Sequence, residues 1–221
     1  MSDSFNATLR RDIDEQWAQI KKGLFWRTVM TQPVSRELYR DLMLEIHHYT
    51  RHNSTNQAAA AFVEAPEGLL KFVYRHAAEE LGHEKMVAHD LRTVGLLDEA
   101  DLRRKPLPPT EALIGYLYFV ALRYGPVARL GYSFWAESVY GHIAELLEKI
   151  SRDLSLQRHN ITFFGSHIQA DKDHSAQVEE AVERFASTPA ERESVRQVAK
   201  TTLFLTGQIL DQVALVHQMR A

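Results

Sequence analysis

The chain has 221 residues, of which 45% are hydrophobic and 25% charged, with a formal net charge of −3. These values predict a soluble globular protein with one domain over residues 1–221. Without a basic block, nucleic acid is not an expected partner, and no apolar run is long enough to cross a membrane. The absence of cysteine excludes disulfides, thiolate metal sites, iron–sulfur clusters and a cysteine nucleophile. The N-terminal segment lacks the apolar core of a secretory signal, so we expect a cytoplasmic protein.

Long stretches of helical periodicity, separated by clustered glycine and proline residues, predict an all-α protein. The helices are expected at about 4–22, 35–62, 66–94, 110–124, 126–150, 155–186 and from 189 nearly to the C-terminus. Residues 24–26 are expected to form an apolar turn, and Ser35, Thr110 and Thr188 are expected to cap the helices that follow them. Short connections between these seven helices predict one compact bundle.

The segment from His167 to His174 reads H-I-Q-A-D-K-D-H, in the helix expected over 155–186. On a helix, the spacing of His167, Asp171 and His174 places all three side chains on one face. Two imidazoles and a carboxylate on one face can bind iron and leave positions open for O2 or a substrate. The same three residues on a solvated face would have no function, so the prediction depends on ligands from other helices.

Such ligands are available on three other expected helices. Glu80 and His83 are three residues apart, and Glu-x-x-His pairs with single glutamates are how helical bundles build di-iron sites. Glu45 lies in an apolar stretch and Glu137 in an aromatic one, where an unpaired carboxylate is costly. A buried ion pair is the alternative explanation for Glu45. The predicted metal ligands are Glu45, Glu80, His83, Glu137, His167, Asp171 and His174.

Three further histidines lie close to these residues in the sequence. His76 shares a helix face with Glu80 and His83, and His48 and His52 follow Glu45 on the preceding helix. We predict that these histidines orient metal ligands or line the rim of the site. For each of the three, direct ligation is the alternative.

Two arginines and two aromatic residues are candidates for substrate binding. Arg123 and Arg129 lie beside aromatic helices, where a guanidinium can bind a carboxylate through two hydrogen bonds. Tyr49 and Trp135 are candidates for the wall of a pocket. Surface positions for the arginines and core packing for the aromatic residues are the alternatives.

Taken in order, these motifs resemble the heme-oxygenase-like di-iron oxidases and oxygenases over about residues 25–186. The quoted elements are Glu45, Glu80-Leu-Gly-His83, Glu137 and His167-Ile-Gln-Ala-Asp171-Lys-Asp-His174. The resemblance implies a seven-helix fold shared with heme oxygenase, TenA-type thiaminase and pyrroloquinoline quinone synthase. It also implies two non-heme iron ions and a peroxo-di-iron(III) intermediate formed with O2. His76 stands where some members carry a glutamate ligand.

The implied function is the O2-dependent oxidation of a small amino-acid-like or carboxylate substrate in specialised metabolite biosynthesis. The expected outcome is N-oxygenation or oxidative C–C or C–N cleavage, with a homodimer as the assembly and an external electron donor for turnover. The alternatives are a fatty-acid oxidative decarboxylase, or a cofactor-free enzyme or binding protein of the TenA or quinone-synthase type. The missing cysteine argues against a thiaminase, and no histidine precedes His47 to bind heme. A manganese–iron pair is compatible with the same ligands.

Overall fold

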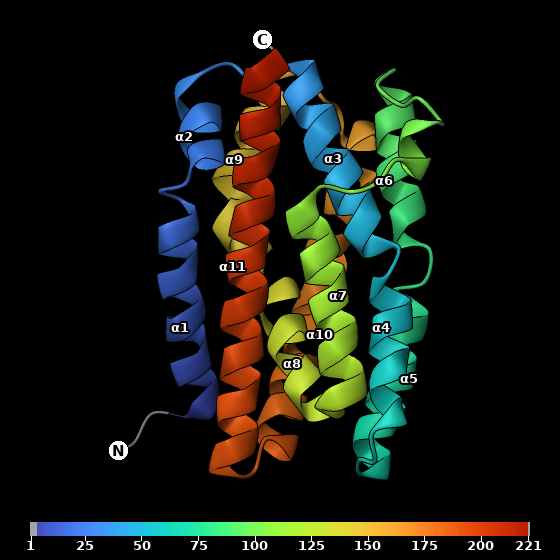
Figure 1. Cartoon of the computed structure of the whole chain (residues 1–221), viewed down its shortest axis with the longest axis vertical. Helices are drawn as coiled ribbons and strands as arrows, with labels where there is room; N and C mark the ends of the chain where they lie inside the picture. Colours follow the sequence, from blue (N-terminus) through green and yellow to red (C-terminus); the bar gives the residue numbers. More distant parts are fainter. Residues whose placement is uncertain (1–3, 221) are drawn as a thin grey trace.

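The computed structural model describes residues 4–220, except for the side chains of 166–173. All regular secondary structure in the described range is helical, which confirms the predicted fold class (Figure 1). The α-helices are α1 (Phe5–Ile20), α2 (Leu24–Thr31), α3 (Arg36–Thr50), α4 (Asn53–Ala59), α5 (Glu67–Glu79), α6 (His83–Thr93), α7 (Pro108–Arg123), α8 (Gly125–Ala136), α9 (Tyr140–Asp153), α10 (Thr162–Phe185) and α11 (Pro189–Arg220). Short 3₁₀ turns lie at Ala60–Phe62, Asp101–Arg103 and Arg158–Asn160.

The described part of the chain has more helices than the seven expected, because three long helices are interrupted. The helix expected over 35–62 is divided into α3 and α4, that over 66–94 into α5 and α6, and that over 126–150 into α8 and α9. At the second interruption Gly82 has a φ of +96°, in the left-handed region that favours glycine and stops an α-helix. The expected turn at 24–26 is also wrong, since these residues begin α2.

Two of the three predicted helix caps are confirmed, but the one at Thr110 is wrong, because α7 begins at Pro108 with Leu107 at its N-cap. The Ser35 hydroxyl accepts a hydrogen bond from the backbone N–H of Leu38 at 3.1 Å. The Thr188 hydroxyl accepts one from the Glu191 N–H at 3.2 Å, and the Glu191 carboxylate accepts one from the Thr188 N–H at 2.8 Å. This reciprocal capping box fixes the start of α11.

Helix α11 organises the bundle. It has 32 residues, runs the full height of the molecule in Figure 1, and contacts α1, α2, α3, α7 and α8. The closest approach is to α8, where a Cβ on Gly131 would lie 2.2 Å from the carbonyl oxygen of Val195. Glycine is therefore required at this crossing, and the crossing fixes the position of α8.

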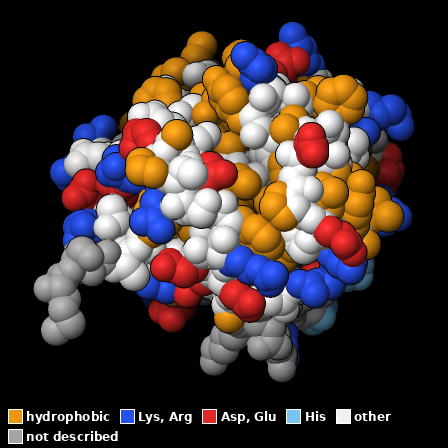
Figure 2. Space-filling view, turned by 90° about the horizontal axis from the view of Figure 1, so that it is seen from below, with side chains coloured by type: hydrophobic (Ala, Val, Ile, Leu, Met, Phe, Trp, Pro, Cys, Tyr) orange, Lys and Arg blue, Asp and Glu red, His pale blue; other side chains and the backbone are white. Residues whose placement is uncertain are grey.

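The interior is one contiguous apolar core, whose largest fully buried side chains include Phe25, Tyr39, Met43 and Leu203. The outer surface is different. On the end of the bundle seen in Figure 2, Lys, Arg, Asp and Glu side chains alternate with apolar patches. Of the helices described, none combines the length and apolar composition needed to cross a bilayer.

We expect Gly131→Ala to lower the free energy of unfolding by roughly 2–4 kcal/mol, because the added methyl group meets backbone that cannot rotate away. The matched control is Gly115→Ala in α7, where nothing lies within 4 Å of the added Cβ. That change should stabilise by about 0.5–1 kcal/mol through helix propensity. Urea denaturation measures both, and equal effects at the two positions would contradict the proposed close packing.

Candidate metal centre

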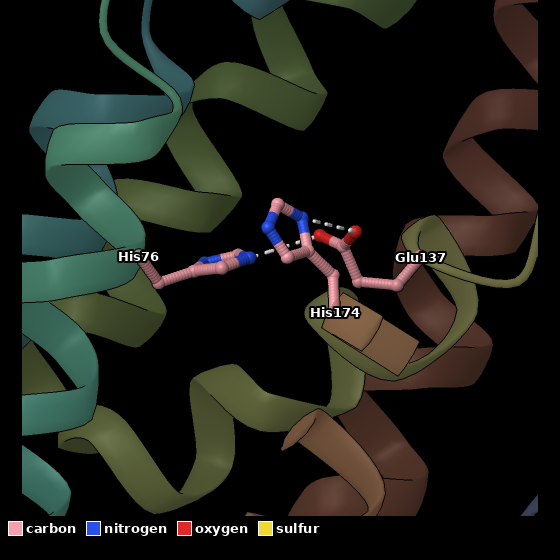
Figure 3. Close-up of side chains that lie close together, drawn as sticks. All are labelled: His76, Glu137 and His174. Atoms are coloured by element: carbon pink, nitrogen blue, oxygen red, sulfur yellow. Dashed lines mark hydrogen bonds and ion pairs between the residues drawn. The ribbon is translucent and has the colours of Figure 1, made fainter. Parts of the chain in front are cut away.

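Three side chains from three helices meet in the interior of the bundle (Figure 3). His76 comes from the last turn of α5, Glu137 from the C-terminal end of α8 and His174 from α10. The Nε2 atom of His76 lies 3.0 Å from Glu137 Oε1, and the Nδ1 atom of His174 lies 3.6 Å from Glu137 Oε2. One potential ligand atom of each residue lies within 4.8 Å of the other two. The carboxylate of Glu137 is thus held between two imidazoles.

A second pair of predicted ligands flanks the interruption between α5 and α6. Glu80 follows the last residue of α5 and His83 begins α6, so Gly82 determines how the two side chains face each other. Glu80 Oε1 lies 3.4 Å from His83 Nδ1, and the Asn53 side-chain amide donates to Glu80 Oε2 at 3.5 Å. The sequence interpretation did not identify Asn53.

The local charges keep both buried glutamates ionised. Burial opposes the charge of Glu137, but hydrogen bonds with His174 and His76 outweigh it and lower its pKa to about 2. Burial likewise opposes the charge of Glu80, yet its hydrogen bond with His83 holds the pKa below the ordinary value. The same hydrogen bond raises the pKa of His83. Two ionised carboxylates therefore repel each other inside the protein.

This donor set fits a metal cation. Carboxylate oxygens and imidazole nitrogens suit iron, manganese or zinc, and a cation would relieve the repulsion between Glu80 and Glu137. His76 Nδ1 is buried without a hydrogen-bond partner among the described residues. The Nε2 atom of His174 lies 3.6 Å from Glu79 Oε2, a contact that orients the ring as carboxylates beside metal-binding histidines do.

The structure brings together only part of the predicted ligand set. Glu80, His83, Glu137 and His174 lie in one region, with His76 in their midst rather than at the rim. The side chains of His167 and Asp171 lie outside the described residues, so their ligation stays a prediction.

Glu45 is not part of this cluster. Its carboxylate accepts hydrogen bonds from the Leu107 backbone N–H and the Thr110 hydroxyl, and it lines a separate small cavity with His48. Helix α3 is apolar on more than one face, so an apolar sequence context could not show which face meets the site. His52 is also elsewhere, with its ring nitrogen 3.1 Å from the Tyr118 hydroxyl. Neither the ligand role of Glu45 nor the supporting roles of His48 and His52 gain support from this geometry.

Three of the candidate ligands, His76, Glu80 and Glu137, form part of the wall of a cavity of about 150 Å³. Beyond His76, Glu80 and Glu137, most of its wall is aliphatic or aromatic. The lining includes Trp17, Ile46, Tyr49, Trp135, Leu146, Ile150, Phe163 and Leu210. Tyr49 and Trp135 therefore lie where the sequence interpretation expected a pocket, and a substrate role for them stays a prediction.

Arg129 lines the same cavity and is only 3% exposed. Its guanidinium donates from Nε and Nη2 to Asn56 Oδ1 and from Nη1 to Ser133 Oγ, at 2.7–2.9 Å. Both partners are neutral, and no described carboxylate lies within ion-pair distance of it. Burial lowers the pKa of Arg129 to about 10, so it stays charged at neutral pH. Arg123, in contrast, is exposed at the end of α7 and does not line the cavity.

Comparison with solved structures shows a close structural relative. A domain of unknown function with a heme oxygenase-like fold from Shewanella denitrificans OS217 has 37% sequence identity and a TM-score of 0.94. The match covers 96% of this chain and 93% of that one. No curated protein is significantly similar in sequence.

More distant structures share the fold alone. A TenA homologue from P. horikoshii OT3 has 15% identity and a TM-score of 0.76, covering 96% of this chain and 98% of its own. Heme oxygenase from Leptospira interrogans has 19% identity and a TM-score of 0.70, covering 95% of this chain and all 100% of its own. The heme-oxygenase-like fold implied by the sequence motifs is therefore confirmed.

The family profile described as iron-containing redox enzyme matches residues 40–207. This range includes Glu80, His83, Glu137 and His174 together with the cavity wall around them. The chain belongs to this family of iron-containing redox enzymes.

Proposed function

We propose that the protein is an O2-dependent oxidase that binds two non-heme iron ions. The observation that supports this most directly is the buried carboxylate of Glu137 between His76 and His174. Glu80 and His83 form a second carboxylate–imidazole pair, close enough for the charge of Glu137 to act on both residues. Glu137 has two oxygens and lies between the two groups, which suits a carboxylate that bridges two metal ions.

The donor set favours non-heme iron over heme. Heme iron is held by an axial side chain such as a single histidine, whereas here a carboxylate separates two imidazoles. Bound iron would supply the electron transfers needed to activate O2. The protein's own groups would orient the metal through Glu79 and His174, and the apolar cavity would exclude water from the reacting atoms.

For the substrate, we propose a carboxylate with an apolar body. Arg129 provides a buried positive charge that forms no ion pair with a described carboxylate, although the charges of Glu80 and Glu137 act on it, and a substrate carboxylate can accept two hydrogen bonds from a guanidinium. The apolar wall of the cavity would then receive the rest of the molecule. An apolar amino acid and a fatty acid both fit, so N-oxygenation or oxidative cleavage beside the carboxylate is the proposed chemistry.

Iron binding is tested by anaerobic Fe(II) titration followed by Mössbauer spectroscopy and mixing with O2. We expect about two iron ions per chain. Glu137→Gln should weaken iron binding by roughly 10- to 100-fold or more, because it removes a charged ligand. A single zinc ion indifferent to O2 would overturn the proposal.

The matched control is Glu45→Gln, since Glu45 and Glu137 are both 7% exposed. The change at Glu45 should leave iron stoichiometry and affinity unaltered. An equal loss of iron in both variants would show that Glu45 is a ligand after all, or that any buried glutamate is needed for folding.

Substrate recognition is tested with Arg129→Met and calorimetric titration of octanoate, L-phenylalanine and their uncharged amides. The variant should bind the carboxylates roughly 10- to 100-fold more weakly and bind the amides about as well as the unmodified protein does. Arg123→Met is the control and should change neither. Equal loss for carboxylates and amides would indicate that Arg129 supports the cavity rather than recognising charge.

A further inference from the structure

All three tryptophans of the chain lie in one row inside the bundle. Trp135 of α8 and Trp17 of α1 have ring centroids 6.4 Å apart, and Trp17 and Trp26 of α2 are likewise 6.4 Å apart. Tyr132 extends the row by one step, with its ring 5.2 Å from that of Trp135. Residues far apart in the sequence thus form a continuous series of oxidisable rings.

The inner end of this row reaches the metal centre. The Tyr132 hydroxyl donates to Asn53 Oδ1 at 3.3 Å, and the Asn53 amide donates to Glu80 Oε2 at 3.5 Å. The outer end lies just beneath the surface beside α1, where Trp26 is 6% exposed and the exposed Lys21 places its Nζ 5.2 Å from the centre of the Trp26 ring. The row therefore extends from a proposed iron ligand to a ring just beneath the surface.

The charges along the row differ from ring to ring. The Arg129 guanidinium lies 4.5 Å from the ring centre of Tyr132 and disfavours positive charge there. Trp17 instead stacks on His142 at 5.2 Å, and the Nε2 atom of His142 lies 3.7 Å from Asp14 Oδ1. A missing electron is favoured on Trp17 over Tyr132 mainly because Arg129 is buried beside Tyr132, whereas the carboxylate of Asp14 is largely exposed and solvent screens its effect on Trp17. The exposed Lys21 opposes charge on Trp26, but solvent screens it.

We propose that Tyr132, Trp135, Trp17 and Trp26 form an electron relay between the surface and the metal centre. The relay rests on the proposed function, because bound iron oxidised by O2 is the electron acceptor. Tunnelling rates fall exponentially with distance, so short ring-to-ring steps are much faster than one direct transfer through the same protein. Three of these rings also line the substrate cavity, which places the relay beside the reacting atoms.

Each event moves one electron and breaks no bond. If iron bound at the site were oxidised, Trp135 would give it an electron through the ring of Tyr132, Trp17 would re-reduce Trp135, Trp26 would re-reduce Trp17, and a soluble one-electron donor such as ascorbate would re-reduce Trp26. The donor is oxidised and the iron is reduced by one electron. The Trp135 indole keeps its proton, which it donates to the weakly basic Thr202 hydroxyl at 2.8 Å. Tyr132 keeps its proton because its acceptor is an amide oxygen.

The first test needs no iron. Because the chain has no cysteine, Lys21→Cys gives one attachment point for a ruthenium photo-oxidant beside Trp26. After flash oxidation in the presence of O2, peptide mass spectrometry should find oxidised Trp17 and Trp135 as well as Trp26. Adding Trp17→Phe should confine the products to Trp26. Oxidation confined to Trp26 without that change would overturn the relay.

The second test uses the labelled protein loaded with Fe(II) under anaerobic conditions. Flash oxidation should convert Fe(II) to Fe(III), followed by absorbance, and the fast phase should be lost in Trp17→Phe and in Trp135→Phe. Phe164→Leu is the matched control, because Phe164 is a buried aromatic residue that lines the cavity but does not belong to the row of rings. It should keep the fast phase.

The two tests separate the relay from the proposed function. Failure to bind iron would leave the first test intact, and migration of oxidation to Trp135 would still be measured. An unchanged fast phase in Trp135→Phe would overturn the relay while the iron-binding proposal stands.

Discussion

The site depends on the burial of one charge, the carboxylate of Glu137. A carboxylate removed from water is strongly destabilising unless other groups compensate it. His76 on α5 and His174 on α10 provide that compensation. The fold must therefore bring α5, α8 and α10 together at Glu137. The contact of α8 with α11 at Gly131 holds the helix that carries Glu137, and the glycine is needed because the two backbones almost touch. The close packing of α8 against α11 therefore also fixes the position of Glu137, a candidate metal ligand.

Interruptions in the helices place side chains that a continuous helix would not. On an unbroken helix, Glu80 and His83 would point in related directions from a common axis. The left-handed conformation at Gly82 turns α6 away from α5, yet leaves the two side chains 3.4 Å apart at the join. Glu137 similarly lies just after the last residue of α8, where the chain turns before α9. Helix ends, rather than helix faces, supply most of the cluster.

This explains how far the sequence could predict the structure. Helical periodicity and the caps at Ser35 and Thr188 are local properties, so the fold class and several helix starts were predicted correctly. The interruption at Gly82 was missed because a single glycine is compatible with a continuous helix. Glu45 was assigned to the site from its apolar neighbours, but burial does not specify direction, and Thr110 and Leu107 satisfy it elsewhere. His76 was expected to orient a metal ligand or line the rim, but the ligand that it approaches could not be predicted, because its contact with Glu137 joins residues 61 positions apart.

The apolar cavity links the three charged parts of the site. Burial makes the carboxylates of Glu80 and Glu137 and the guanidinium of Arg129 costly, and the opposite charges of these three residues partly compensate one another across the cavity. In the folded protein, Asn56 and Ser133 accept hydrogen bonds from Arg129, and the neighbouring histidines contact the carboxylates. These charged groups are therefore already fixed in position. Groups fixed in advance need little reorganisation when a ligand arrives, so a metal cation and a substrate carboxylate would each gain the full interaction. The arrangement is compatible with the proposed metal cation and substrate carboxylate side by side in a cavity that Trp135 and Tyr132 also line.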